Sequence, residues 1–221
     1  LDDADLTPAI TGSVNAVMQN SGQSCRAATR MLAPNTLMDQ VCAIAKEVAE
    51  TWTPGDPTGN ARMGPVVSEA QWNKVQKLIQ SGVDDGVKVV TGGLGKPEGL
   101  ETGYFVKPTI LANVTNDMAV AREEIFGPVL CILGYDTLDQ AIEIGNDTDY
   151  GLAGYVQSKD IDKARAVGRE IRAGYISLNN AGLDLNVPFG GYKQSGNGRE
   201  FGDFAFSEFL ELKSVLGWNP A

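Results

Sequence analysis

Short apolar runs alternate with amphipathic stretches along this chain. The apolar runs are a few residues long and are bounded by glycine, proline or polar residues, which is typical of buried strands. We predict a strand at each of them, at residues 30–33, 87–91, 109–111, 129–133, 154–157 and 175–178.

The amphipathic stretches between these runs predict helices. Asn35, Ser68 and Asp160 are suitable N-caps, and Gln71 completes a capping-box pattern with Ser68. Gly82 is expected to end the helix that follows Ser68, and further helices are expected around residues 138–142 and after residue 202. Strands that alternate with helices predict an α/β fold with a largely parallel twisted sheet flanked by helices. In such folds ligand sites lie beyond the carboxyl ends of the strands.

Charge and hydropathy narrow the class of protein. The net charge is −10 over 221 residues and the acidic residues are scattered, which argues against nucleic acid or a membrane surface as a partner. The aliphatic run at 129–133 is far too short to span a membrane. The chain starts at Leu1 with acidic residues and no secretory signal, so we expect a cytoplasmic protein whose sequence begins inside a longer one.

The cysteines and the lack of histidine restrict the possible chemistry. The chain has 3 cysteines, none in a CxxC pair, and 0 histidines. A histidine-ligated metal site, a Ser-His-Asp triad and a Cys-His pair are therefore excluded within this chain, and no zinc knuckle or other metal site is expected. Free thiols are typical of a reducing compartment.

Cys25 is the candidate nucleophile. It lies in Asn-Ser-Gly-Gln-Ser-Cys-Arg-Ala, a small, polar, glycine-bearing segment ahead of a predicted strand. Backbone amides there, or Arg26, would favour the reactive thiolate. The alternative is a buried and inert cysteine, which is how the apolar surroundings of Cys42 and Cys131 are interpreted.

Two further segments stand out. Residues 123–128 read Glu-Glu-Ile-Phe-Gly-Pro, in which Glu124 could accept both hydroxyls of a ribose and Phe126 could pack on a flat heterocycle. Taken alone, this segment could equally be a solvated acidic turn. The glycine-rich segment 188–200, which contains Phe189, indicates tight backbone geometry near a rim or an interface, or simply a loop.

Taken together, these segments resemble the aldehyde dehydrogenase superfamily along essentially the whole chain. The shared motifs follow in the family's order and are Gly-Gln-x-Cys at 22–25, Glu-Glu-Ile-Phe-Gly-Pro at 123–128, Asn-x-x-x-Tyr-Gly-Leu at 146–152, Pro-Phe-Gly-Gly at 188–191 and Ser-Gly-x-Gly-Arg-Glu at 195–200. Several co-ordered matches are far more specific than any one of them alone.

The resemblance implies oxidation of an aldehyde to a carboxylic acid with NAD or NADP. Cys25 would attack the aldehyde and pass through a thiohemiacetal and a thioester, Glu124 would bind a cofactor ribose with Phe126 near the nicotinamide, and Ser24, Arg26 and Phe189 would bind substrate. It also implies a homo-oligomer, a dimer or tetramer, that pairs through a C-terminal strand at residues 211–216.

The domain expectation is a catalytic domain at 1–200 and a C-terminal helix and oligomerisation strand at 201–221, with an N-terminal nucleotide-binding domain absent. The family's general-base glutamate and the asparagine of its oxyanion hole would belong to that absent part, so the isolated chain is expected to be inactive. Two other readings stay open: a cofactor-independent thiol esterase that uses Cys25, and a non-catalytic oligomerisation module.

Overall fold

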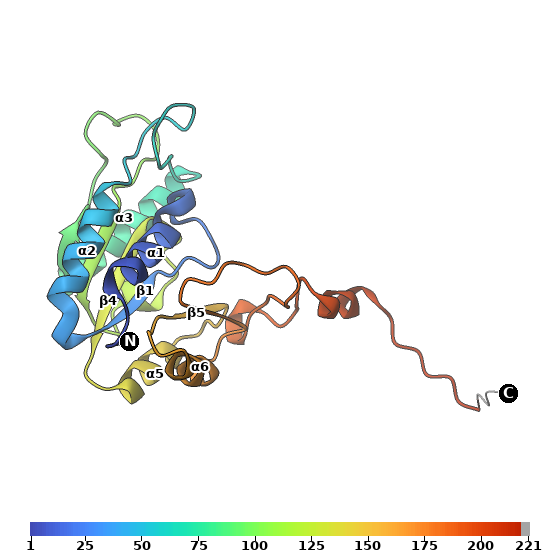
Figure 1. Cartoon of the computed structure of the whole chain (residues 1–221). Coiled ribbons are helices and arrows are strands. Elements are labelled where there is room, and N and C mark those ends of the chain that lie inside the picture. The colour runs from blue at the N-terminus through green and yellow to red at the C-terminus, as the bar shows by residue number, and fades with distance from the viewer. Residues whose placement is uncertain (218–221) are drawn as a thin grey trace.

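The computed structural model describes residues 1–217 and has the predicted α/β architecture (Figure 1). Every strand predicted from the sequence is present with small shifts at its ends, whereas helices α1 and α4 were not predicted. The strands are β1 (Arg30–Pro34), β2 (Lys88–Thr91), β3 (Thr109–Val114), β4 (Val129–Tyr135), β5 (Ala153–Val156) and β6 (Tyr175–Leu178). The α-helices are α1 (Leu6–Met18), α2 (Met38–Glu50), α3 (Glu69–Asp84), α4 (Ala119–Arg122), α5 (Leu138–Asn146) and α6 (Ile161–Glu170).

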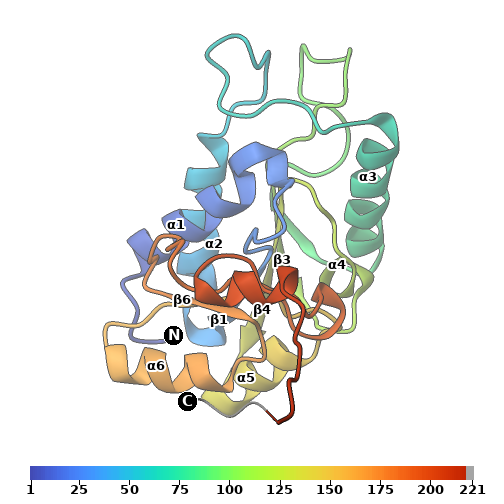
Figure 2. The same cartoon turned by 90° about the vertical axis from the view of Figure 1, so that its right-hand side faces the viewer.

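The strands are largely parallel, as expected, but they divide into two sheets. The main sheet has the order β1-β4-β3-β2, in which only the β2–β3 pair is antiparallel. Strands β5 and β6 form a separate parallel pair. Figure 2 shows α1 and α2 on one side of the main sheet and α3 with α4 on the other, so the sheet is the middle of three layers.

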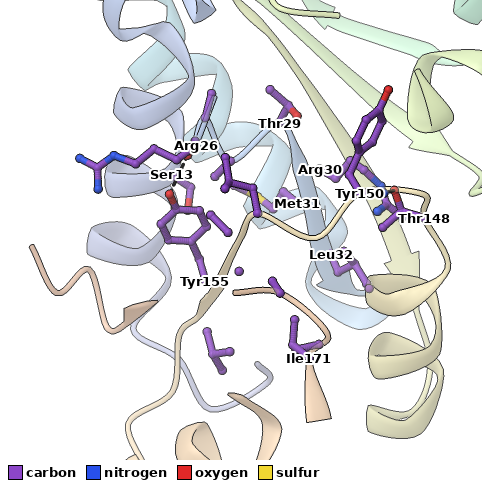
Figure 3. Close-up of a pocket in the computed structure, with 18 of the residues that line it drawn as sticks. Ser13, Arg26, Thr29, Arg30, Met31, Leu32, Thr148, Tyr150, Tyr155 and Ile171 are labelled. Carbon is purple, nitrogen blue, oxygen red and sulfur yellow. Dashed lines mark hydrogen bonds between the residues drawn. The ribbon is translucent and has the colours of Figure 1, made fainter. Parts of the chain in front are cut away.

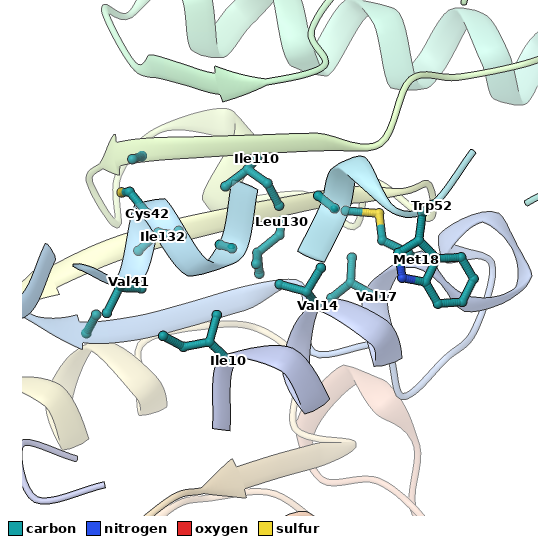
Figure 4. Close-up of a cluster of buried hydrophobic side chains, with 14 of the residues drawn as sticks. Ile10, Val14, Val17, Met18, Val41, Cys42, Trp52, Ile110, Leu130 and Ile132 are labelled. Atoms are coloured by element: carbon teal, nitrogen blue, oxygen red, sulfur yellow. The ribbon is translucent and has the colours of Figure 1, made fainter. Parts of the chain in front are cut away.

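Strand β4 lies at the centre of the main sheet and is buried on both faces. Leu130 and Ile132 pack into the cluster formed with α1 and α2 (Figure 4), whereas Val129, Cys131 and Leu133 pack into the cluster formed with α3 and α4. This alternation explains why β4 reads as one unbroken apolar run rather than as an apolar–polar alternation.

Two of the three predicted N-caps, Ser68 and Asp160, are confirmed, whereas Asn35 lies in a 3-10 helix before α2 and does not cap it. The Ser68 hydroxyl accepts a hydrogen bond from the Gln71 backbone N–H at 3.2 Å, and the Asp160 carboxylate caps α6 through the Lys163 N–H at 3.2 Å. The prediction that Gly82 ends its helix was wrong. Gly82 is buried inside α3, where a side chain would press on the core, and the helix continues to Asp84.

The C-terminal region differs from its prediction. A 3-10 helix at Asp203–Phe209 replaces the expected helix, and the predicted strand at residues 211–216 is not formed within the described residues. They run along an arm that extends away from the body (Figure 1), and Leu212 on this arm is fully exposed. A strand needs a neighbouring edge to pair with, which explains why none forms on the arm. Residues 218–221 of the expected 201–221 segment lie outside the described residues. Among residues 1–217 no helix is long and apolar enough to cross a membrane.

The same substitution at a buried and at an exposed leucine should separate the effect of burial from the effect of the residue type. Leu130 is fully buried between layers, so Leu130→Ala should lower the free energy of unfolding by about 2–5 kcal/mol. Leu212→Ala removes the same atoms from the exposed arm and should change it by less than about 0.5 kcal/mol. Urea denaturation followed by circular dichroism measures both. Equal effects would contradict the layer assignment.

Asp3 ties the N-terminal segment to the start of α6 and should make the fold sensitive to acid. Its carboxylate accepts from the Ser158 hydroxyl at 2.6 Å and from the Asp160 N–H at 3.1 Å. The Ser158 bond above all holds the Asp3 pKa below its ordinary value of 3.8. Its stabilising contribution is therefore present above that value and is lost as the pH falls below it.

Asp3→Ala should consequently lower the melting temperature at pH 6, and the gap to the unmodified chain should narrow by pH 3. Asp5→Ala is the matched control, because Asp5 makes no capping hydrogen bond with its side chain. A gap that stays constant between pH 6 and pH 3 would show that Asp3 acts through packing alone.

Candidate active site

Cys25 lies on an exposed turn immediately before β1, whereas Cys42 and Cys131 are buried. The expected difference between Cys25 and the other two cysteines is therefore present in the structure. The site lies at the amino ends of β1 and β4, not beyond the carboxyl ends as the general rule for parallel sheets predicted. Strands β1 and β4 are parallel neighbours, so the segments that precede them lie at the same end of the sheet.

Two glycines bring the Cys25 segment against the 123–128 segment. Gly22 has φ +74°, and a Cβ placed on it would lie 1.9 Å from the carbonyl oxygen of Gly127. A Cβ on Gly127 would in turn lie 2.6 Å from a methyl carbon of Val75 on α3. No side chain fits in either place, so the backbones of the two segments touch, which glycine alone allows.

Helix α3 holds the 123–128 segment in its conformation. The Gln71 side-chain amide donates to the carbonyl oxygens of Ile125 at 2.9 Å and Phe126 at 2.8 Å. Phe126 itself has φ +54°, an uncommon conformation for a bulky residue, which these two bonds help to maintain. The Gln71 side chain therefore bonds to this loop and not to the backbone N–H of Ser68, as a capping box would require. The capping-box pattern in the sequence did not reveal this contact.

The two segments share one cavity of about 580 Å³. The proposed site residues Ser24, Cys25, Arg26, Glu124 and Phe126 all line it. Glu124 is exposed and Phe126 is half-buried, so both remain accessible to a ligand.

In the described part of the chain, Phe189 does not line this cavity. It pairs with Glu200 through an isolated antiparallel bridge, and its ring meets that of Tyr175 edge-on with centroids 5.7 Å apart. The assignment of Phe189 to substrate binding therefore stays a prediction.

Tyr155 joins the site from β5, and sequence reasoning gave it no role. Its hydroxyl donates to the carbonyl oxygen of Arg26 at 2.6 Å, which fixes the turn directly after Cys25 (Figure 3). Burial raises the Tyr155 pKa, so the phenol stays protonated and remains a donor at neutral pH. The separation along the chain hid this contact, because no local pattern links residue 155 to residue 26.

Arg30 brings a positive charge into the cavity wall. Its guanidinium donates to the carbonyl oxygen of Ile144 at 3.0 Å and also bonds to Asn116. Its Nε is buried without an acceptor among the described residues, and burial lowers the Arg30 pKa. Figure 3 shows Arg30 beside Tyr150 and Thr148, whereas Arg26 points away from them.

The candidate site thus combines the accessible Cys25 thiol, the positively charged Arg30 in the cavity wall and the exposed Glu124 carboxylate. Among residues 1–217 no group of histidine, cysteine, aspartate or glutamate side chains is arranged to hold a metal ion. No backbone carbonyl in the described part of the chain accepts from the Cys25 N–H, which leaves this donor open beside the thiol. Such an N–H is available to donate to an oxygen atom of a bound ligand.

Comparison with known proteins places this chain in a family. The model of the aldehyde dehydrogenase family matches residues 1–215, so the chain belongs to that family. It is 50% identical over 219 residues to 3-succinoylsemialdehyde-pyridine dehydrogenase from a Pseudomonas species, covering 99% of this chain and 46% of that protein. The chain therefore spans about half the length of the curated relatives it matches.

Solved structures agree with the family assignment. A cysteine-to-alanine mutant of aldehyde dehydrogenase C from Pseudomonas syringae, in complex with NAD+ and octanal, superposes with a TM-score of 0.97 at 46% identity, covering 100% of this chain and 46% of that one. A Mycobacterium tuberculosis aldehyde dehydrogenase complexed with NAD+ gives a TM-score of 0.94 at 41% identity, with the same coverage.

The three thiols should differ strongly in reactivity. A disulfide reagent such as Ellman's should modify one thiol of the folded chain quickly and all 3 after unfolding in urea. Burial raises the pKa of Cys131 to about 12 and also raises that of Cys42, so both stay as slow thiols at pH 8. Cys25→Ser should abolish the fast phase and Cys42→Ser should leave it intact. A fast phase that survives Cys25→Ser would refute the assignment.

Proposed function

We propose that this chain is the catalytic portion of an enzyme that oxidises an aldehyde to a carboxylic acid with NAD or NADP. The observation that carries the proposal is the meeting of exposed Cys25 with Glu124 and Phe126 in one cavity. Family membership and the NAD+ complexes of its structural neighbours support it.

Cys25 is the group that would form the covalent intermediate. Its thiolate adds to the aldehyde carbon and gives a thiohemiacetal, whose oxygen carries the developing negative charge. The open Cys25 N–H would donate to that oxygen, and Tyr155 would hold the turn that aims this N–H. After hydride leaves the carbon, the product is a thioester on Cys25, and water releases the acid and restores the thiol.

The residues in the cavity fit a nicotinamide dinucleotide. Glu124 is exposed and can accept hydrogen bonds from both hydroxyls of a ribose, and the half-buried Phe126 ring offers a flat apolar surface beside it. Gln71 would keep Phe126 in its left-handed conformation and so keep the ring at this position. The cofactor supplies the acceptor for the hydride.

The proposed site residues of this chain include no general base for the deacylation step. The family resemblance implies a general base and a second oxyanion donor outside this chain, so we expect deacylation of Cys25 to be slow here. A thiol esterase that acylates readily and turns over poorly is therefore the second candidate function, and the accessibility of Cys25 favours it.

The exposed arm supports an assembly role beside the catalytic one. Its apolar side chains point into solvent, and a partner copy would cover them in a homo-oligomer, either a dimer or a tetramer. These residues include Phe204, Phe206, Phe209, Leu210, Leu212 and Leu216. A cytoplasmic location agrees with the 3 free thiols.

An acylation experiment tests this function. With p-nitrophenyl acetate the chain should release a burst of about one nitrophenol per chain and then turn over slowly. Cys25→Ala should abolish the burst and Cys42→Ala should retain it. The chain alone should produce no NADH from octanal and NAD+. A longer polypeptide that supplies the base should produce NADH and lose activity by at least about a thousandfold on Cys25→Ala.

Two results would overturn the proposal. One is a burst that persists in Cys25→Ala. The other is a longer polypeptide whose aldehyde oxidation survives that substitution.

A further inference from the structure

The turn around Cys25 is closed by one backbone hydrogen bond. The Ala27 N–H donates to the carbonyl oxygen of Ser24 at 3.0 Å, so residues 24–27 form a tight turn that contains Cys25. The Ser24 carbonyl and the Cys25 N–H belong to the same peptide unit, in which resonance couples the two groups. Within residues 1–217 no backbone carbonyl accepts from the Cys25 N–H. A carbonyl that accepts a hydrogen bond polarises its own peptide unit, which makes the N–H of that unit a stronger donor.

Tyr155 adds a second hydrogen bond to this turn. Its hydroxyl donates to the carbonyl oxygen of Arg26 at 2.6 Å (Figure 3). The Arg26 carbonyl shares its peptide unit with the Ala27 N–H, which is the donor that closes the turn. Strand β5 holds the phenol at this position, because Tyr155 is paired with Ser177 of β6 in the parallel ladder.

The two bonds form one continuous relay through two peptide units. The relay starts at the Tyr155 hydroxyl, passes through the unit of residues 26–27 and then the unit of residues 24–25, and ends at the open Cys25 N–H. Its polarity is the same at every step, since each N–H or O–H donates to the carbonyl of the next unit. Hydrogen bonds arranged in such a chain strengthen one another by about 10–30% per bond. The phenol can therefore strengthen a donor that lies two peptide units away.

Contacts outside the second sheet fix the course of the chain on both sides of the turn. Before the turn, the Gln23 side-chain oxygen accepts from the Val67 N–H at 2.9 Å. After it, the Thr29 carbonyl oxygen accepts from the Cys131 N–H of β4, also at 2.9 Å. These bonds keep the course of the chain when the Tyr155 hydroxyl is removed. What that hydroxyl adds is the orientation and the polarity of the peptide units between them.

We propose that Tyr155 is a positioning residue that strengthens the Cys25 N–H, through this relay, as the donor to the oxygen of the tetrahedral intermediate. The inference deepens the proposed function and rests on it, because it requires Cys25 to be the nucleophile. Tyr155 acts through the backbone alone. Burial raises the Tyr155 pKa above its ordinary value of 10.0, so the phenol remains a donor throughout the neutral range.

Two reactions of the same thiol separate this role from a merely structural one. With p-nitrophenyl acetate, the Cys25 thiolate adds to the carbonyl carbon, negative charge moves to the carbonyl oxygen, and collapse expels p-nitrophenolate and leaves a thioester. With iodoacetamide, the thiolate displaces iodide from a saturated carbon and no oxyanion forms. Both reactions consume the thiolate, so their rate ratio at one pH does not depend on how much of the thiol is ionised. A weaker Cys25 N–H slows the acylation alone, whereas a displaced thiol slows both reactions.

Three variants of the full chain make the comparison. Tyr155→Phe should lower the rate of acylation by about three- to tenfold, because loss of a whole oxyanion donor costs about a hundredfold or more and the relay supplies only part of one donor's strength. Its rate of alkylation should stay within about twofold of the unmodified chain. Tyr104→Phe is the matched control and should change neither rate, because Tyr104 is an exposed loop residue that does not line the cavity in the described part of the chain. Replacement of Tyr155 by 3-fluorotyrosine, whose more acidic phenol is a stronger donor, should raise the rate of acylation and leave alkylation unchanged.

The outcomes that would overturn the relay are distinct from those that would overturn the proposed function. Equal acylation rates in Tyr155→Phe and the unmodified chain refute the relay, and so does a loss that acylation and alkylation share. If circular dichroism shows that Tyr155→Phe does not fold, the fluorotyrosine variant decides, and an acylation rate no higher than that of the unmodified chain refutes the relay. If the unmodified chain gives no burst, or Cys25→Ala retains it, the proposed function fails and the relay fails with it.

Discussion

The contact between the backbones at Gly22 and Gly127 determines how the Cys25 segment and the 123–128 segment can lie. Any side chain at either position would drive the Cys25 segment away from the 123–128 segment, because the space for a Cβ is already filled by main-chain atoms and by Val75. Val75 belongs to the cluster that packs α3 on the main sheet. The distance between the thiol and the Glu124 carboxylate is therefore governed by the core and not by the flexibility of two surface loops.

Strand register explains why such distant segments meet. In the β1–β4 ladder Arg30 is paired with Cys131. Cys25 and Phe126 precede these partners by equal numbers of residues, so they emerge side by side from the same sheet edge. The parallel neighbours β1 and β4 thus bring both halves of the candidate site together at their amino ends. A rule based on carboxyl ends fails here because the glycine-bearing segments lie before the strands.

The sequence allowed the strands and the difference in exposure among the three cysteines to be predicted, because both depend on local signals. Buried strands such as β4 appear as apolar runs, and Cys25 differs from Cys131 in its immediate neighbours. Helix α1 escaped prediction because its propensity is poor: it contains Pro8 and Gly12. It forms because Val14 and its neighbours are fully buried against the sheet.

The contacts of Gln71 and Tyr155 could not be found in the sequence for a different reason. Each depends on a partner far away in the chain, and a side-chain amide or a phenol carries no local sign of which carbonyl it will meet. The division into two sheets was hidden in the same way. Strand-like patterns show that strands exist, but they do not show which edges find a neighbour.

The divided sheet and the site are physically coupled. Cys25 and Leu1 line the same cavity, which lies in the gap between strands β1 and β5. Across that gap, Tyr155 on β5 reaches the turn after Cys25 with one hydrogen bond, and Arg30 on β1 reaches the chain before β5. The orientation of the turn at Cys25 therefore depends on how the two sheets are placed relative to each other, because the Tyr155 bond reaches this turn from the second sheet.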